Sequence, residues 1–449
     1  MQAASNRRNA GISRRSGTFG PTGAGSLRRI GRQVVPAASL FTLAGLTGCF
    51  PSPVETAPTS APPAPFVRAP YVQNVSSDSA SVLWMTSDEA TDSVRYRKLE
   101  PATGAEQTDW RRAALEDRGR GVRLARLTGL TAASATEYEV FSGSKSAGVS
   151  RFRTAPESRP SEPVRVLLFG DSGWGSEEQV QLARRMERMD WDLSIHVGDI
   201  AYYDGSETDF TERHFKVYRR MLAEVPFYPS VGNHDVRADG GASYDRAFDW
   251  PRADPGSRYY AFRWGSIQFI ALDTSSDSPD VHQLWVGKGR QYDWLEKTLR
   301  SASRDTMVDW IVVFGHHPPY SHAVGISGHG PNRDLRLNLP PLFERYGVDL
   351  VASGHDHHYE RFRPIRRGKP VADGCGPVYV IQGAGGASRY ARDVARSEFT
   401  AAASRAFSFT ELVFARDRIR GRTIGTDGGV IDEFTLRPYD GPEAAGCDD

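Results

Sequence analysis

The chain has 449 residues, too many for one ordinary hydrophobic core, so we expect two folded domains. Its composition, with 39% hydrophobic and 25% charged residues, is typical of a soluble globular protein. The first 49 residues hold seven of the 56 basic residues and none of the 55 acidic ones, so the remainder carries a formal charge of −6. An acidic remainder offers no electrostatic footprint for nucleic acid, and we expect no nucleic-acid binding.

Residues 1–49 are typical of an export signal. Three arginines between positions 28 and 32 precede an apolar stretch at 34–46, which is too short to span a bilayer. The stretch ends in Leu46-Thr47-Gly48-Cys49, which resembles the lipobox of bacterial lipoproteins. Cleavage before Cys49 would leave a cysteine that carries a lipid. The alternative is an ordinary signal peptide with an incidental cysteine.

Residues 50–65 are rich in Pro, Ala, Ser and Thr, a composition that behaves as a semi-extended tether. Together with the lipobox, the tether predicts an exported lipoprotein of a bacterial cell envelope, on the outer surface or facing the periplasm. The membrane would then be a partner through Cys49, and secretion is the alternative. No coiled-coil heptad is visible that would indicate an oligomeric state.

Residues 66–155 carry the pattern of an all-β domain. Short apolar-rich runs occur at 81–86, 93–97, 122–127, 138–141 and 149–153, with turn residues between them. This spacing predicts a β-sandwich, and the order of Trp84 and Tyr138 within it resembles a fibronectin type III-like domain. Because no metal-ligand cluster falls in this region, we interpret it as a spacer or packing partner rather than a substrate-binding domain.

From residue 163 to about 440 the pattern changes to apolar runs interspersed with helical segments. Residues 164–169 predict a buried strand, 177–189 an amphipathic helix, and 259–273 a hairpin around Gly265-Ser266. Strands interspersed with helices imply a layered α/β domain.

Several apolar runs of this domain end in a glycine followed by a potential metal ligand. Side chains at the carboxyl ends of adjacent strands converge on one crevice, and glycine lets the chain turn sharply there. Seven of the eleven histidines also lie between positions 316 and 358. The motifs are Gly170-Asp171-Ser172-Gly173, Gly198-Asp199-Ile200-Ala201-Tyr202, Gly232-Asn233-His234-Asp235, Gly315-His316-His317-Pro318 and Gly354-His355-Asp356-His357.

These ligand types predict a transition-metal site. Carboxylate, imidazole and amide donors suit first-row transition ions, whereas the lack of thiolates argues against a structural zinc knot. One aspartate such as Asp199 can bridge two ions. Two ions about 3.5–4 Å apart can clamp a phosphate and lower the pKa of a bound water for in-line attack on phosphorus.

The ordered motifs resemble those of the metallophosphoesterase, or calcineurin-like phosphoesterase, superfamily: D-x-G at 171–173, G-D-x-x-Y at 198–202, G-N-H-[DE] at 232–235, V-x-x-H at 313–316 and G-H-x-H at 354–357. The tyrosine within G-D-x-x-Y and the run at 354–361, similar to G-H-x-H-x-Y-E-R, resemble the purple acid phosphatases. Larger members of that family also carry an N-terminal β-domain. The resemblance covers nearly all of the chain after the tether. It implies a four-layer metallophosphoesterase β-sandwich flanked by helices.

The resemblance also implies a binuclear centre of Fe(III) and a divalent ion, which would be iron, zinc or manganese. The ferric ion would be held by Asp171, Asp199, Tyr202 and His357, and the divalent ion by Asp199, Asn233, His316 and His355. A shift of one place would put Tyr203 in the position of Tyr202, although the motif spacing favours Tyr202.

Two further histidines are expected beside the metals. By the same resemblance, His234 would contact the phosphate or the leaving group. A second histidine should follow His316: the His329-Gly330-Pro331 triplet resembles that of small family members, and His322 is the competitor. The identity of the general acid therefore stays open between His329 and His322.

The leading hypothesis is an acid phosphatase that hydrolyses small phosphate monoesters by attack of a metal-bound hydroxide on phosphorus. A phosphodiesterase or nucleotide hydrolase with the same two metals is the alternative, because strand-end ligands do not define the substrate. A third reading is a surface adhesion lipoprotein with a degenerate catalytic fold. In an oxidising compartment Cys375 and Cys447 could pair or remain free, because the sequence does not show their distance.

Overall fold

The computed structural model describes residues 65–87, 91–99, 109–275, 279–323, 329–389, 396–439, 441 and 447. The predicted signal segment with Cys49, and the predicted tether up to residue 64, lie outside these residues. Within the described ranges, no helix is both long and apolar enough to cross a membrane.

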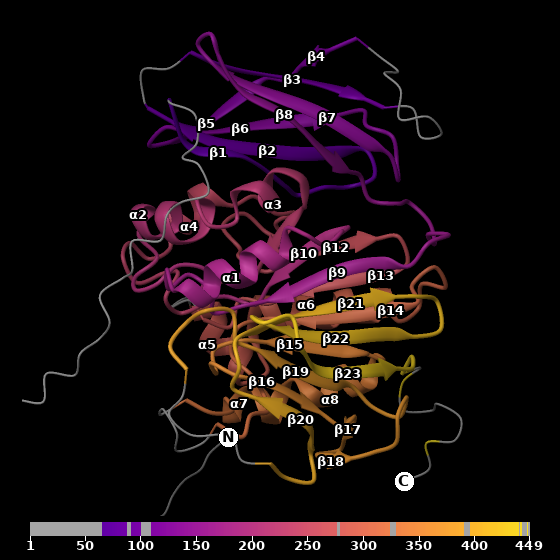
Figure 1. The fold of residues 1–449 in the computed structure, drawn as a ribbon. Coiled ribbons are helices and arrows are strands. Elements are labelled where there is room, and N and C mark those ends of the chain that lie inside the picture. The colour runs from indigo at the N-terminus through magenta and orange to yellow at the C-terminus, as the bar shows by residue number, and fades with distance from the viewer. Residues whose placement is uncertain are drawn as a thin grey trace, which may run out of the picture. The chain divides into compact units, whose positions relative to one another are not determined.

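The N-terminal part of the described chain is all-β, and its strands are indigo to magenta in Figure 1. Two four-stranded antiparallel sheets enclose buried side chains such as Trp84, Leu124 and Tyr138. The five runs expected from the sequence lie in β2, β3, β6, β7 and β8. The sheets are β1(Phe66–Gln73)-β2(Ser79–Thr86)-β6(Val122–Thr128)-β5(Leu115–Gly119) and β4(Arg111–Arg112)-β3(Asp92–Lys98)-β7(Ala135–Ser142)-β8(Lys145–Arg153).

This β-domain packs directly on the catalytic domain. The Tyr71 hydroxyl donates to the carbonyl of Ala247 at 2.8 Å, and the Tyr138 hydroxyl donates to the carbonyl of Ala223 at 2.7 Å. The buried Asp249 carboxylate accepts from Ser81 Oγ at 2.7 Å. Helix α3 (Arg219–Glu224) lies between the N-terminal strands and the catalytic sheets in Figure 1. The β-domain is thus fixed to the catalytic domain by buried polar contacts.

The catalytic domain contains two large mixed sheets. In the six-stranded sheet β9, β10 and β11 run parallel, and in the seven-stranded sheet β13, β14, β15 and β19 do so. The orders are β11(Phe227–Pro229)-β10(Leu193–His196)-β9(Val164–Phe169)-β21(Ser408–Phe414)-β22(Ile419–Gly425)-β23(Val430–Leu436) and β12(Tyr260–Trp264)-β13(Ile267–Ala271)-β14(Trp310–Phe314)-β15(Leu350–Ser353)-β19(Val378–Gln382)-β16(Tyr359–Phe362)-β20(Thr400–Ser404). The antiparallel pair β12 and β13 forms the hairpin that the sequence predicts.

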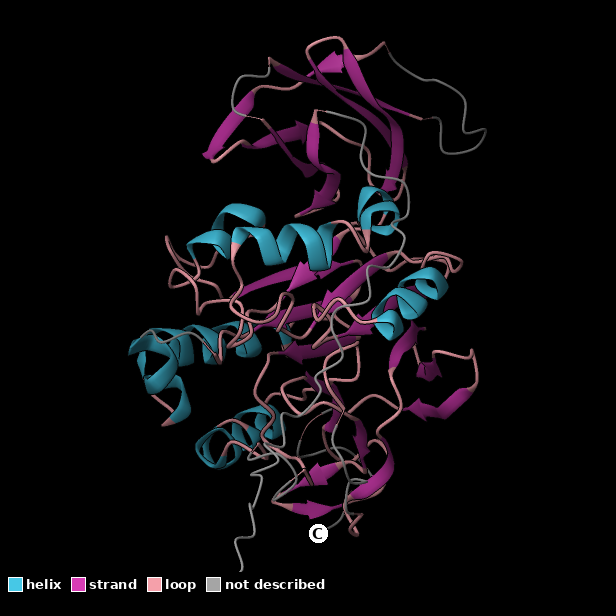
Figure 2. Cartoon of the chain, turned by 60° about the vertical axis from the view of Figure 1, so that its left-hand side comes forward, coloured by secondary structure: helices cyan, strands magenta, loops and turns pink. Residues whose placement is uncertain are grey.

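Side chains that alternate along the strands divide the buried residues into two hydrophobic cores, one on each face of the seven-stranded sheet. Along β14, Val312 and Phe314 join the core shared with β9 and β10, whereas Ile311 and Val313 join a second core. That second core includes Leu295 and other side chains of the helices that cover the seven-stranded sheet. In Figure 2 helices flank the strands of the two mixed sheets, and one group of these helices lies beneath the N-terminal strands. The remaining helices are α1(Glu177–Met186), α2(Glu207–Phe210), α4(Ala242–Ala247), α5(Pro279–Trp285), α6(Gly289–Ala302), α7(Arg333–Asn338) and α8(Pro340–Arg345), with the π-helical turn η1(Thr211–Phe215) after α2 and the short strands β17(Ile365–Arg366) and β18(Lys369–Pro370).

Helix α1 shows how local sequence and packing combine. Ser176 caps its N-terminus by accepting from the amide of Gln179, and two glutamates occupy the first turn, where the helix dipole favours them. The helix ends at Met186, three residues earlier than its apolar pattern predicts. Its buried face includes Gln179 with Leu182 and Met186. Burial of the polar Gln179 is compensated by two hydrogen bonds, from the amide of Gly175 and to the carbonyl of Arg213 in η1.

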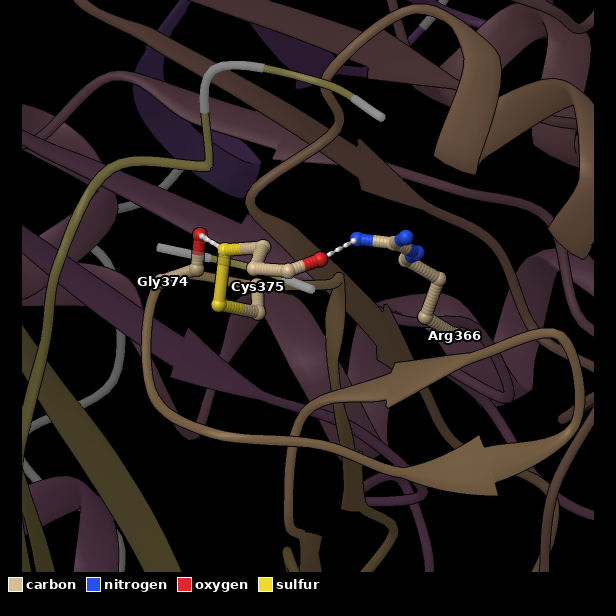
Figure 3. The surroundings of a disulfide bond; sticks show 4 residues. Arg366, Gly374 and Cys375 are labelled. Carbon is tan, nitrogen blue, oxygen red and sulfur yellow. Dashed lines mark hydrogen bonds between the residues drawn. A yellow bond between two sulfur atoms is a disulfide. The ribbon is translucent and has the colours of Figure 1, made fainter. Parts of the chain in front are cut away.

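A disulfide joins Cys375 to Cys447, with 5.3 Å between their Cα atoms (Figure 3). The guanidinium of Arg366 donates to the carbonyl of Cys447 at 3.0 Å. Of the two states that the sequence leaves open, the structure shows the paired one. The bond links residue 447, near the C-terminus, to the segment before β19.

Candidate metal centre

The potential ligands lie on loops at the carboxyl ends of parallel strands. Asp171 follows β9, Asp199 follows β10 and Asn233 follows β11, all in the six-stranded sheet. His316 follows β14, and His355 follows β15, in the seven-stranded sheet. Because the two sheets stack, the loops of both meet at one edge.

One group of donor atoms surrounds the phenol of Tyr202. Its Oη lies 3.0 Å from Asp199 Oδ2, 3.3 Å from Asp171 Oδ1 and 3.0 Å from His357 Nε2. Tyr202 is buried, whereas the neighbouring Tyr203 is 49% exposed and packs edge-to-face against Trp174. The structure therefore brings Tyr202, and not Tyr203, to the carboxylates.

A second group surrounds the side chain of Asn233. Its Oδ1 lies 3.1 Å from His316 Nε2 and 3.0 Å from His355 Nδ1. Separations of about 3 Å are those of neighbouring ligands around an ion bound at about 2.0–2.2 Å. The distances from Tyr202 Oη and from Asn233 Oδ1 are therefore those expected between neighbouring ligands of an ion.

Asp199 belongs to both groups. Its Oδ2 lies 3.0 Å from Tyr202 Oη and 3.4 Å from His316 Nε2. Potential ligand atoms of Asp171, Asp199 and His316 all lie within 4.8 Å of one another, and the three residues are buried. This trio is a candidate metal-ligand cluster.

The backbone at the site adopts conformations that side chains rarely allow. Asp171, Asp199 and His355 have φ values of 52°, 53° and 69°, in the left-handed region. At two of the motif glycines, the absence of a side chain allows another part of the site to approach the backbone closely. A Cβ at Gly232 would lie 2.0 Å from the amide nitrogen of Asp199, and one at Gly354 would lie 2.3 Å from Asp171 Oδ2.

Asp235 ties two ligand-bearing loops together. Its buried carboxylate accepts from the amides of Ile200 at 2.8 Å and Ala201 at 3.1 Å, and from the amide of Gly232 at 2.8 Å. Sequence reasoning assigned no role to this residue, although an acid inside a ligand motif is a signal for one. Asp235 holds the Asp199–Tyr202 loop against the Asn233 loop.

Backbone contacts orient two imidazoles. The Nδ1 atoms of His316 and His357 lie 2.8 and 2.7 Å from the carbonyls of Val197 and Ser388. A carbonyl can only accept, so Nδ1 carries the proton in both rings. Each Nε2 then faces the other candidate ligands and can bind a metal once it has lost its proton.

The electrostatics fit a bound cation. Burial raises the pKa of Asp171 well above its usual range. Burial also raises the pKa of Asp199, but the His316 imidazole outweighs this effect and holds the pKa of that carboxyl well below its usual range. Burial lowers the pKa of His316, and the Asp199 carboxylate then raises it to about 9. Buried carboxylates need positive partners, and this oxygen-rich donor set with imidazoles suits a transition-metal ion.

His234 and His329 lie beside these groups. The His234 amide donates to Asp199 Oδ1 at 2.8 Å, and its Nδ1 lies 2.6 Å from the carbonyl of Tyr203. Its Nε2 lies 3.9 Å from Asp199 Oδ2. His329 Nδ1 lies 3.0 Å from His355 Nε2, and His329 is exposed.

His322, the competitor of His329, has other partners. Its Nδ1 lies 2.6 Å from Oε1 of the buried Glu360, and its Nε2 lies 2.9 Å from Ser397 Oγ. Glu360 Oε2 accepts from the amide of His322 at 3.1 Å and lies 3.2 Å from His358 Nε2. The structure thus brings His329 to the candidate ligand His355, whereas His322 contacts Glu360. Sequence reasoning assigned no role to the buried Glu360.

Comparisons with known proteins show similarity to phosphoesterases. Residues 164–359 match the calcineurin-like phosphoesterase family. An uncharacterised protein of Mycobacterium tuberculosis is 27% identical over 384 residues, covering 74% of this chain and 71% of the relative. Purple acid phosphatase 21 of Arabidopsis thaliana is 28% identical over 278 residues, covering 60% of this chain and 59% of the relative. Acid phosphatase type 7 of Homo sapiens is 29% identical over 258 residues, covering 53% and 57%.

Among solved structures, a purple acid phosphatase from yellow lupin (Lupinus luteus) seeds superposes with a TM-score of 0.71 at 20% identity, covering 85% of this chain and 77% of that chain. The structure of PhoD superposes with a TM-score of 0.64 at 13% identity, covering 86% and 92%. These likenesses show a shared fold. The chain is a phosphoesterase-type hydrolase with the metallophosphoesterase fold. Residues 164–359 form a calcineurin-like phosphoesterase domain, and the chain is similar in sequence to purple acid phosphatases.

Proposed function

We propose that the chain is an acid phosphatase that hydrolyses phosphate monoesters at a binuclear metal centre. The observation that carries this proposal is the place of Asp199 between two donor groups. Its Oδ2 faces the Tyr202 phenol at 3.0 Å and the His316 imidazole at 3.4 Å, so one carboxylate can serve two ions.

The donor sets differ in a way that suits two different ions. Asp171, Asp199, Tyr202 and His357 would hold Fe(III), because hard anionic oxygens favour a high charge. Asp199, Asn233, His316 and His355 would hold a divalent iron, zinc or manganese ion. Bound ions of this kind neutralise phosphoryl charge and activate a water as nucleophile.

The chain itself supplies the groups around the phosphate. The carbonyl of Tyr203 accepts the Nδ1 proton of His234, so the imidazolium form of His234 can donate its Nε2 proton to an ester oxygen. His329, exposed beside His355, can deliver a proton to the departing alcohol. The contact of His322 with Glu360 favours His329 for this role.

Metal analysis and a visible spectrum of the purified protein test the proposal. We expect iron together with a second ion, and an absorption band that disappears in Tyr202→Phe. Hydrolysis of nitrophenyl phosphate should exceed that of bis-nitrophenyl phosphate. A colourless, iron-free protein that still hydrolyses phosphate esters would contradict the purple subclass.

The same assay separates the other functions. A preference for the bis-ester would favour a phosphodiesterase or nucleotide hydrolase at the same site, because the fold does not define the substrate. Purified protein that binds no metal would favour the adhesion lipoprotein.

The cellular location is a separate proposal, which rests on Leu46-Thr47-Gly48-Cys49 and on the Pro-rich segment that follows. We propose that Cys49 is lipidated and anchors the enzyme to a bacterial envelope membrane. Cys49→Ser should move the protein from the membrane fraction to the soluble fraction. Unchanged fractionation would contradict lipidation.

A further inference from the structure

The main chain at Tyr202 is held on both sides by residues outside the candidate ligand set. The amide of Tyr202 donates to the carbonyl of Gly173 at 2.9 Å. The carbonyl of Tyr202 accepts from Arg213 Nη1 at 2.7 Å. Because the backbone sets the direction of the side chain, these two bonds aim the phenol at Asp171, Asp199 and His357.

Arg213 is itself held in place. It lies in the π-helical turn η1, where the amide of Lys216 donates to the carbonyl of Thr211 at 3.0 Å. The carbonyl of Arg213 accepts a hydrogen bond from Gln179 Nε2 at 2.7 Å. The Nε atom of Arg213 lies 3.6 Å from Asp209 Oδ1. Short π-helical segments are frequent at functional sites. The donor that reaches Tyr202 therefore comes from a turn that is itself held by hydrogen bonds.

The same turn is tied to the β-domain by Arg68 of strand β1. Arg68 Nε donates to Thr211 Oγ1 at 2.9 Å, and Nη2 donates to the carbonyl of Glu207 at 3.0 Å. Its guanidinium also pairs with the Glu207 carboxylate and lies 4.5 Å from the centre of the Phe215 ring. The Arg68 side chain is 0% exposed. A fully buried arginine with charged and polar partners is costly to remove, so this junction is well defined.

We propose that Arg213 is a positioning residue for the Tyr202 ligand, and that Arg68 of the β-domain supports Arg213 through Thr211. The inference rests on the proposed role of Tyr202 as an iron ligand. It gives the β-domain a part in the metal site, although that domain contributes no ligand. Partners outside the ligand set orient ligands, and their loss typically lowers metal affinity about 10–100-fold.

Arg213→Met tests the first link, because methionine keeps much of the side-chain length and removes every donor. Purified full chains would be challenged with an iron chelator while the visible band and the metal content are followed. We expect iron to be lost about tenfold faster than from the parent, with a shifted or weakened band. Thermal unfolding by circular dichroism shows whether the variant is folded.

Two variants sharpen this result. Arg220→Met makes the same chemical change at an exposed arginine of α3 and should match the parent. Arg213→Lys keeps a cationic donor and should recover part of the parental band and chelator resistance. A merely structural role of Arg213 would change unfolding without moving the band.

The contact between Arg68 of the β-domain and η1 is tested by Thr211→Val. This substitution removes the acceptor of Arg68 Nε and nearly preserves the shape of the side chain. We expect a smaller increase in iron loss than in Arg213→Met, in a folded protein. Arg68→Met is the stronger variant, and its spectrum is compared only if it folds. Parental iron loss in folded Thr211→Val would overturn the β-domain part of the inference.

The outcomes separate this inference from the proposed function. If the parent is coloured and Tyr202→Phe is not, but Arg213→Met keeps the parental band and loses iron within about twofold of the parental rate, the inference alone is overturned. If the parent holds no iron, or if its band survives Tyr202→Phe, the role of Tyr202 fails and the inference fails with it.

Discussion

The two large sheets supply different chemistry to the candidate metal centre. Loops of the six-stranded sheet bring the oxygen donors, and loops of the seven-stranded sheet bring the nitrogen donors. The oxygen donors are Asp171, Asp199, Tyr202 and Asn233, and the nitrogen donors are His316, His355 and His357.

Neither sheet alone offers a complete shell. In the proposed assignment each ion takes ligands from both sheets, so the ions link the two halves of the sandwich. Binding to the folded state alone would then stabilise the protein. The site therefore depends on how the two sheets pack against each other.

The largest effect is expected at Asp199, which faces donors of both sheets. Asp199→Asn removes the bridging charge, so both ions should bind weakly and phosphatase activity should fall about 10³-fold, or about 4 kcal/mol. Metal analysis together with steady-state kinetics measures this. Retention of two ions per chain would contradict the bridging role.

The ligand-bearing loops of the six-stranded sheet can also be displaced by a change that acts on the backbone. A Cβ at Gly232 would lie 2.0 Å from the amide nitrogen of Asp199, so Gly232→Ala must displace that loop and should lower metal content and melting temperature. At Gly315 the nearest atom to an added Cβ is Thr274 Cγ2 at 3.2 Å, so Gly315→Ala is the matched control. Equal losses in the two variants would contradict the close-approach argument.

On the seven-stranded side, His329 and His322 should differ. We expect His329→Ala to lower kcat about 10²-fold with metal content unchanged, because it removes the proposed proton donor. His322→Ala leaves the Glu360 carboxylate with fewer partners and should destabilise folding by about 1–3 kcal/mol with less effect on kcat. The reverse pattern in kinetics and unfolding would make His322 the catalytic histidine.

The smallest effect is a pH dependence of stability at Glu360. Burial raises its pKa, but hydrogen bonds from His322 and His358 lower it from 4.5 to about 2. A carboxyl whose pKa is lower in the folded state contributes stability above about pH 4.5, which is lost as the pH falls through about 2. The destabilisation by Glu360→Gln, about 1–3 kcal/mol near neutral pH, should therefore shrink between these values.

Urea unfolding at several pH values measures this trend. The exposed Glu116→Gln serves as the control and should leave the unfolding free energy unchanged. A constant difference between Glu360→Gln and the parent across the acid range would contradict the assigned cause.

Much of the fold could be predicted because the patterns are local. Alternating runs predicted β2, β3, β6, β7 and β8, and the Gly265-Ser266 turn predicted the β12–β13 hairpin. Helix α1 was predicted three residues too long, because its apolar face continues beyond the point where the backbone leaves the helix. The short strands β4 and β5 were not predicted, because their side chains are mostly exposed and show no apolar alternation.

The sequence by itself determined the phosphoesterase class, because five strand-end motifs resemble those of the metallophosphoesterases in type and order. Only the tertiary structure decided which neighbours share a site, because that depends on contacts between residues far apart in the chain. It placed Tyr202 inside and Tyr203 outside, and it joined His322 to Glu360 and His329 to His355. The meeting of oxygen and nitrogen donors has the same cause, since it needs two sheets packed face to face.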